Sequence, residues 1–224
     1  MTIQVKGLRK KYFNKEAVKG VDFTIEPESI IGLLGRNGAG KSTVLNMIAR
    51  RIEKTSGDIT LDGVDLHKTP RAMHQVYLSS TENWFPKEYK FKDLLSIYKK
   101  TYPEFDSDFA EDLIKVFGVN VKERFSKAST GYQSIMKIIL ALCNPSEYIF
   151  MDEPVLGLDA NHRHIFNKKL LEAYARNPRT FVIATHLIEE VATILEKVIV
   201  IKDGVVTEEV MVEEVLGKGA VLQA

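Results

Sequence analysis

A glycine-rich segment near the N-terminus has the residue types and spacing that most directly indicate chemistry. Residues 35–42 are Gly-Arg-Asn-Gly-Ala-Gly-Lys-Ser and fit the pattern G-x-x-x-x-G-K-S/T. Glycines allow a loop to turn its backbone N–H groups into one concavity, where the dipole of a following helix favours anions. We therefore predict a loop that binds nucleotide phosphates, formed by Gly35, Arg36, Asn37, Gly38, Ala39, Gly40, Lys41, Ser42 and Thr43.

Two side chains of this loop have separate expected roles. Lys41 is expected to reach the β- and γ-phosphates, and the Ser42 hydroxyl is expected to hold Mg²⁺. The alternative is a glycine-rich turn that binds nothing. The pattern arises by chance in roughly one chain in a hundred of this length. The flanking sequence opposes that alternative, because residues 30–34 predict a buried strand and apolar residues within 44–52 have helical spacing.

Two adjacent carboxylates follow another apolar run. Residues 148–151 show no alternation, so we predict a strand buried on both faces, followed by Asp152 and Glu153. Ligands of a parallel sheet bind beyond the C-terminal ends of its strands. Asp152 is suited to Mg²⁺, and Glu153 to orienting or deprotonating an attacking water. Alone, the pair would be better explained as the start of a polar turn; the phosphate loop upstream favours the catalytic interpretation.

A histidine occupies the corresponding place after a third apolar run. His186 follows residues 181–185, so it also lies at the C-terminal end of a predicted strand. A neutral imidazole there could hydrogen-bond a γ-phosphate or the attacking water. Because a lone histidine is more often a structural residue of a turn, this prediction depends on the motifs around it.

The order of the other elements indicates an α/β fold. Alternating apolar residues predict an antiparallel strand at 21–25, and turn residues bound a short strand at 58–61. We expect helices at 160–175 and 191–195, with a strand at 198–201 that enters a hairpin at Asp203-Gly204. Strands alternating with helices predict a mostly parallel sheet flanked by helices.

Between these strands the pattern changes to helical. Apolar residues recur at helical spacing from 91 to 143, with breaks at Pro103 and at Asn144-Pro145. We therefore predict a helical subdomain inserted at approximately residues 81–145, within one domain that spans residues 1–224. No internal repeat suggests further domains.

Composition limits the classes of partner. Lys and Arg total 31 against 30 for Asp and Glu, so the net charge of +1 gives no bulk electrostatic argument for a nucleic acid partner. Cys143 is the only cysteine, which excludes an intrachain disulfide. Neither a leader peptide nor an apolar stretch of the roughly 20 residues that span a bilayer is apparent. We expect a cytoplasmic chain that is peripheral to the inner face of the cell membrane through a partner.

Beyond these patterns, nearly the whole chain resembles the ATP-binding subunit of ATP-binding cassette (ABC) transporters. Residues 33–43 look like the family's Walker A motif, and residues 151–154 look like Walker B, with Glu153 at the catalytic position. Residues 156–159 resemble the D-loop, which includes Asp159, and His186 resembles the switch histidine. The resemblance implies ATP and Mg²⁺ as ligands. It also implies a P-loop NTPase core with an N-terminal antiparallel β subdomain and the inserted helical subdomain.

Three further positions are assigned only by this resemblance. Tyr12 stands where the family has an aromatic residue that stacks on adenine, although an ordinary half-buried tyrosine explains it equally well. At the family signature, residues 128–132 keep Ser129 and Gly131 but carry Thr130 in place of a glycine. At the Q-loop, Ser80 occupies the usual position of a glutamine, and Glu82 is close enough to substitute.

The family's arrangement implies the partners. Two cassettes pair head to tail, as a homodimer or heterodimer, and drive a membrane-spanning transporter subunit that residues 80–92 would face. Within those residues Trp84, Phe85 and Tyr89 are either partner contacts or core residues of the helical subdomain. The altered signature beside intact Walker motifs predicts that, in a heterodimer, the chain's own Walker site is the active one. Bacterial exporters of peptides or small molecules are the nearest analogy.

Two functions from other classes are weighed against transport. One is a soluble ABC-type ATPase that serves an assembly task without a membrane partner. The other is a nucleotide-sensing module with little hydrolysis. Steady release of phosphate that depends on Glu153 would exclude the second.

Overall fold

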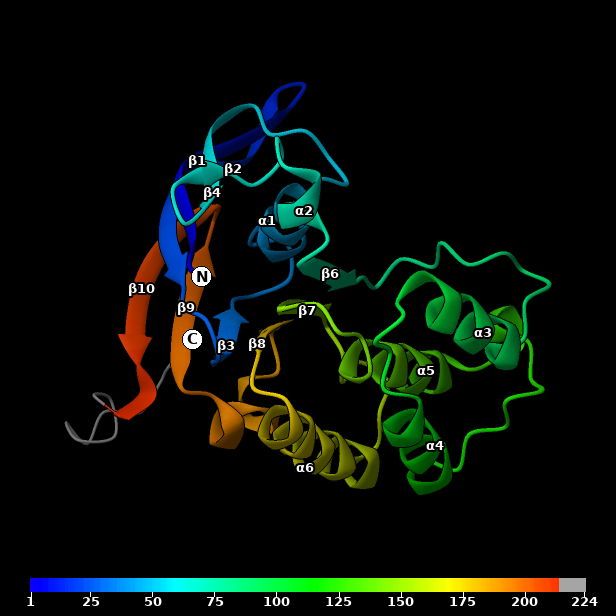
Figure 1. Ribbon diagram of the computed structural model, residues 1–224. Helices are drawn as coiled ribbons and strands as arrows, with labels where there is room; N and C mark the ends of the chain where they lie inside the picture. The colour runs from blue at the N-terminus through cyan, green and yellow to red at the C-terminus, as the bar shows by residue number, and fades with distance from the viewer. Residues whose placement is uncertain (214–224) are drawn as a thin grey trace.

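The computed structural model describes residues 1–213, which form two β-sheets with helices around them (Figure 1). Residues 214–224 of the predicted domain lie outside the described range. The N-terminal sheet has the strand order β2-β1-β4-β5, with every neighbouring pair antiparallel. Its strands are β1 (Ile3–Tyr12), β2 (Lys15–Ile25), β4 (Ser56–Leu61) and β5 (Val64–Asp65). The alternation at 21–25 and the strand at 58–61 are confirmed.

A six-stranded sheet with the order β10-β9-β3-β8-β7-β6 carries the predicted parallel strands. All its pairs are parallel except β9 with β10. The strands are β3 (Ile30–Leu34), β6 (Val76–Ser79), β7 (Tyr148–Asp152), β8 (Thr180–Thr185), β9 (Lys197–Lys202) and β10 (Val205–Met211). The predicted hairpin at Asp203-Gly204 joins β9 to β10, and both residues have left-handed backbone, with φ of 51° and 83°.

Alternate residues of the central strands enter two different cores, which is why these strands lack polar alternation. Tyr148 and Phe150 of β7 pack with α1 (Lys41–Ile48) and the N-terminal sheet. Ile149 and Met151 of the same strand pack with the helices on the opposite face. Figure 1 shows α1 and α2 (Pro70–Met73) on one side of the sheet, and α5 (Thr130–Leu142) and α6 (Ala160–Arg176) on the other.

Three helices lie between β6 and β7. They are α3 (Phe91–Thr101), α4 (Ser107–Val116) and α5, and Figure 1 shows α3 and α4 extending away from the six-stranded sheet. Their apolar stripes meet in a core that contains Phe91, Phe109 and Phe125. Phe85 packs edge to face on Phe125 with ring centroids 4.9 Å apart, so Phe85 belongs to this core, whereas Trp84 is 71% exposed. Cys143 is buried at the end of α5.

The predicted α-helix at 191–195 is wrong. The chain there forms two 3-10 turns, Ile188–Glu190 and Ala192–Ile194. Val191 and Leu195 are buried against the helical core, which explains their apolar character without a regular helix. The segment is too short for a stable α-helix and enters β9 directly.

Candidate nucleotide-binding and hydrolytic site

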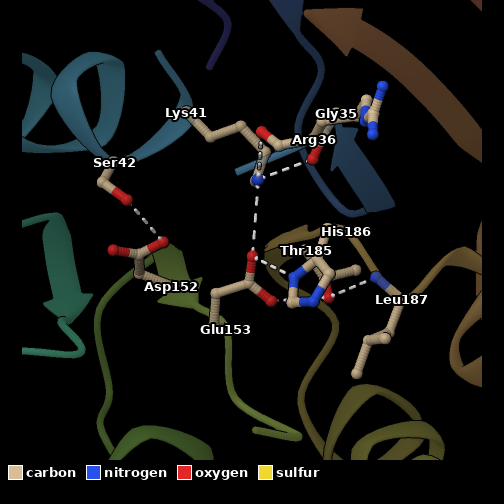
Figure 2. Close-up of polar contacts among 9 residues, drawn as sticks. All are labelled: Gly35, Arg36, Lys41, Ser42, Asp152, Glu153, Thr185, His186 and Leu187. Atoms are coloured by element: carbon tan, nitrogen blue, oxygen red, sulfur yellow. Dashed lines mark hydrogen bonds and ion pairs between the residues drawn. The ribbon is translucent and has the colours of Figure 1, made fainter. Parts of the chain in front are cut away.

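The predicted catalytic groups meet at one edge of the six-stranded sheet. Strands β3, β8 and β7 are neighbours and run parallel, so the segments that follow them end at the same edge. The loop after β3 lies there with Asp152 at the end of β7, with Glu153 after it, and with His186 after β8 (Figure 2). Residues more than a hundred positions apart in the sequence are thereby brought into contact.

Close backbone packing explains the glycines of the loop. A Cβ atom on Gly35 would lie 2.2 Å from the carbonyl oxygen of Ile201, and one on Gly40 would lie 3.0 Å from that of Ala17. Gly40 also has a φ of 113°, which L-residues rarely adopt. The N–H of Gly204 donates to the Ala39 carbonyl at 3.0 Å, so the β9–β10 hairpin holds the loop in place.

Lys41 occupies the centre of this loop and is 5% exposed. Its Nζ atom donates to the carbonyls of Gly35 at 2.7 Å and Arg36 at 3.4 Å. The same atom lies 3.4 Å from Oε1 of Glu153 (Figure 2). The ammonium group therefore stands between the loop and the hydrolytic carboxylate, where it can neutralise a bound polyphosphate.

Ser42 and Asp152 form the oxygen-rich corner of the site. The Ser42 hydroxyl donates to Oδ1 of Asp152 at 3.1 Å. Burial raises the pKa of Asp152, and the hydrogen bond from Ser42 opposes that shift. A hydroxyl beside a carboxylate is a donor set that suits Mg²⁺, so these two residues fit the predicted metal.

Glu153 is held by groups of β8 and by the residue that follows that strand. Its backbone is left-handed, with a φ of 48°, and its N–H donates to the Ala184 carbonyl at 2.8 Å. Oε2 accepts from the Thr185 hydroxyl at 2.8 Å, and Oε1 lies 2.9 Å from Nδ1 of His186. Because a carboxylate accepts, this contact places a proton on Nδ1 and leaves Nε2 of a neutral His186 as an acceptor. Backbone strain of this kind is characteristic of functional sites.

The signature and D-loop residues lie at the starts of two helices, apart from this cluster. Ser129 caps α5 by accepting from the Tyr132 N–H at 3.3 Å, and Asp159 caps α6 by accepting from the His162 N–H at 2.8 Å. A Cβ atom on Gly131 would lie 2.2 Å from the Gly157 carbonyl oxygen. The two segments therefore pack against each other within this chain.

The two Q-loop candidates, Ser80 and Glu82, differ in burial. Ser80 is buried and its hydroxyl accepts from the Glu82 N–H at 3.1 Å, whereas the Glu82 side chain is exposed. Ser80 lines a cavity of about 150 Å³ together with Asp152 and Glu153. Tyr12, at the end of β1, is 41% exposed, and Nζ of Lys10 lies 4.8 Å above its ring.

Comparison with known proteins identifies the class of this arrangement. A profile of the ABC transporter family matches residues 18–156, more than half of the chain. The chain belongs to the ABC transporter family. As an ATP-binding subunit of this family, the cassette is an ATPase. Among the part of the chain that the structure describes, no helix is both long and apolar enough to cross a bilayer.

Individual relatives support the same assignment. ABC transporter ATP-binding protein YtrB of Bacillus subtilis strain 168 is 29% identical over 95% of this cassette and 73% of its own length. ABC transporter ATP-binding protein NatA of the same organism is 33% identical over 84% of the cassette and 79% of its own length. A solved dimeric bacterial ABC transporter cassette aligns with a TM-score of 0.80 at 22% identity, and covers 94% of this cassette and 98% of that chain. The predicted fold is thereby confirmed.

Three supporting residues were missed by the sequence analysis. Thr185 holds Glu153, and a hydroxyl residue directly before His186 was an available signal. Gly204 holds the phosphate loop, but the sequence indicated only its turn. Lys137 contacts the segment after β6, and its one signal was a lysine within the apolar run of α5.

Proposed function

We propose that this cassette powers export of a peptide or small molecule by a separate membrane-spanning subunit, and that its own Walker site performs the hydrolysis. The observation that carries the proposal is the fixed position of Glu153, between Lys41 on one side and Thr185 and His186 on the other. Such a carboxylate at a phosphate-binding loop is arranged for attack of water on a terminal phosphate.

Each group has a role that follows from its position. The amides of residues 35–43 hold the triphosphate, and Lys41 offsets its charge. Ser42 and Asp152 hold Mg²⁺, which neutralises charge on the phosphates when bound. Glu153 orients the water and accepts its proton, while Nε2 of His186 can accept a hydrogen bond from that water.

The partner surfaces are also part of the proposal. Ser129 is exposed at the N-terminus of α5, where a hydroxyl and helix N–H groups can meet the ATP of a second cassette. Thr130 beside it is also exposed and takes the place of the usual glycine. We therefore favour a heterodimer in which this signature faces the weaker of two ATP sites.

The contact with the membrane subunit is proposed at the loop after β6. Trp84 there is 71% exposed, as an apolar anchor for a partner helix would be. Such a contact would hold the cassette at the inner face of the cell membrane. Export is proposed by analogy, because a cassette separate from its membrane subunit and with an altered signature resembles bacterial exporters of peptides and drugs.

The test is purification from mild detergent with the wild-type chain as bait. Recovery of a multi-span protein and a second cassette, with phosphate release that Glu153→Gln removes, supports the proposal. Uptake of candidate substrates into inside-out vesicles then tests the direction of transport. Recovery of soluble assembly proteins without a membrane subunit would instead favour the assembly ATPase.

A further inference from the structure

One lysine of α5 binds three consecutive carbonyl groups of the loop after β6. Nζ of Lys137 donates to the carbonyl oxygens of Ser80 at 2.8 Å, Thr81 at 2.8 Å and Glu82 at 3.2 Å. An ammonium group has three protons to donate, so this geometry uses the full donor capacity of the side chain. The contacts join residues more than fifty positions apart, which fixes the loop to the helix.

Neighbouring residues of α5 extend this connection in both directions. Gln133 accepts from the Asn83 side-chain amide at 2.6 Å and donates to the Ala128 carbonyl at 2.9 Å. The Ser134 hydroxyl donates to the Leu156 carbonyl at 2.9 Å. Position 137 follows position 133 by four residues and position 134 by three, so its side chain neighbours both on the helix surface. One polar face of α5 therefore contacts the Q-loop, the signature start and the D-loop.

The environment of Lys137 disfavours its positive charge. Burial lowers its pKa to about 8, which means that desolvation disfavours the charged form. A methionine or leucine would fill the same volume without that cost. Lys137 also lines the cavity that contains Asp152 and Glu153. An ammonium group therefore lies beside the hydrolytic site, although desolvation disfavours its charge.

We propose that Lys137 is a positioning residue for ATP hydrolysis, which fastens residues 80–82 to the signature helix and so keeps this loop beside Asp152. The inference rests on the proposed function, in which Asp152 and Glu153 take part in ATP hydrolysis. Ser80 has a shorter side chain than the glutamine that the resemblance leads us to expect at this place. The Ser80 hydroxyl therefore reaches only groups close to its own backbone. Its position depends on the backbone of residue 80, which Lys137 holds through the Ser80 carbonyl.

The connection has a consequence for coupling. A movement of the loop after β6 would pass to the start of α5 through Lys137 and Gln133. It would reach the D-loop through Ser134. The surface proposed for the membrane subunit and the surface proposed for the second cassette are thus joined by one rigid helix.

The test compares Lys137→Met and Lys137→Arg with wild type, using Lys99→Met on the exposed face of α3 as the matched control. Trp84 is the only tryptophan and lies two residues after the fastened segment, so its fluorescence anisotropy reports the mobility of the loop that this segment begins. We expect Lys137→Met to lower Trp84 anisotropy and to reduce kcat roughly tenfold or more, with KM for ATP within about twofold. Lys137→Arg should keep most of the wild-type kcat and Trp84 anisotropy, and Lys99→Met should change neither kcat nor anisotropy.

The proposal would be overturned if Lys137→Met had the same kcat and the same Trp84 anisotropy as wild type. A loss of kcat without any change in anisotropy, unrescued by Lys137→Arg, would also overturn it. If Lys137→Met melts below the assay temperature, Lys137→Gln takes its place, since an amide keeps the volume with fewer donors. If wild type releases no phosphate, the proposed function fails, whereas Trp84 anisotropy still decides whether Lys137 fastens the loop.

Discussion

Two regions of this cassette differ in how completely one chain forms them. The catalytic edge consists of Lys41, Asp152 and Glu153, and the signature face consists of Ser129 and Thr130. At the catalytic edge, Lys41 and Asp152 are buried, and the Glu153 carboxylate contacts the side chains of Lys41, Thr185 and His186. At the signature face, Ser129 and Thr130 are exposed, and the Ser129 hydroxyl accepts a hydrogen bond from the nearby Tyr132 N–H. The chain therefore preorganises its own hydrolytic charges, whereas its signature residues are open to a second surface.

The same division separates the retained motifs from the altered ones. Every Walker position keeps the residue type that its chemistry requires, whereas Thr130 in the signature and Ser80 at the Q-loop differ from the residues that the resemblance leads us to expect. Lys137 belongs to the signature helix α5 and contacts the loop near Asp152, so it connects the two regions. The following predictions test whether the two regions differ in function as they do in structure.

Replacement of the hydrolytic carboxylate should have the largest effect. Glu153→Gln keeps the hydrogen-bonding shape but cannot accept a proton, so we expect steady-state phosphate release to fall by roughly 10²- to 10⁴-fold. ATP binding should persist, because the phosphate loop is untouched. Glu111→Gln, on the exposed face of α4, is the control and should match wild type. Rapid turnover in Glu153→Gln would remove Glu153 from the mechanism.

Loss of the imidazole should have the second largest effect. His186→Ala removes the 2.9 Å contact to Oε1 of Glu153, and a hydrogen bond to a charged group is worth about 1.5–3 kcal/mol. We expect kcat to fall by roughly tenfold to a hundredfold, because Glu153 loses a group that orients it. Single-turnover kinetics measures the chemical step. An unaltered rate would mean that Thr185 and Lys41 hold the carboxylate without His186.

A smaller effect is expected where the signature meets the D-loop. In Gly131→Ala the new Cβ would lie 2.2 Å from a backbone oxygen of Gly157, so one segment must move. We expect the free energy of unfolding to fall by about 1–3 kcal/mol, as measured by urea denaturation. Ser134→Ala, which removes a hydrogen bond but adds no atom, should cost less. Equal stability of Gly131→Ala and wild type would show that the segments separate freely.

The smallest effect concerns the altered signature itself. Thr130→Gly restores the small residue that the family resemblance leads us to expect, at an exposed position of α5. If Thr130 crowds a partner's ATP, turnover of the assembled dimer should rise by roughly twofold to fivefold, although glycine costs about 1 kcal/mol of helix stability. Slower turnover would show that this signature is adapted to its threonine.

The sequence determined some parts of this account better than others. Strands β3, β7 and β8 were predictable because continuous apolar runs end in chemically distinctive residues, and parallel pairing places those ends together. The 3-10 turns at 188–194 were not predictable, because short apolar periodicity has the same appearance in a buried irregular segment. The contact of Lys137 with residues 80–82 depends on tertiary packing between distant segments, which local periodicity does not contain.

Calorimetric titration of Mg²⁺-ATP into wild type and Lys41→Ala tests the central claim most directly, since Lys41 joins the phosphate loop to Glu153. The account predicts clear binding by wild type and an affinity weakened by roughly tenfold or more in the variant, because a charge-assisted contact to phosphate is lost. Absence of binding by wild type, or equal affinity of the two proteins, would contradict it.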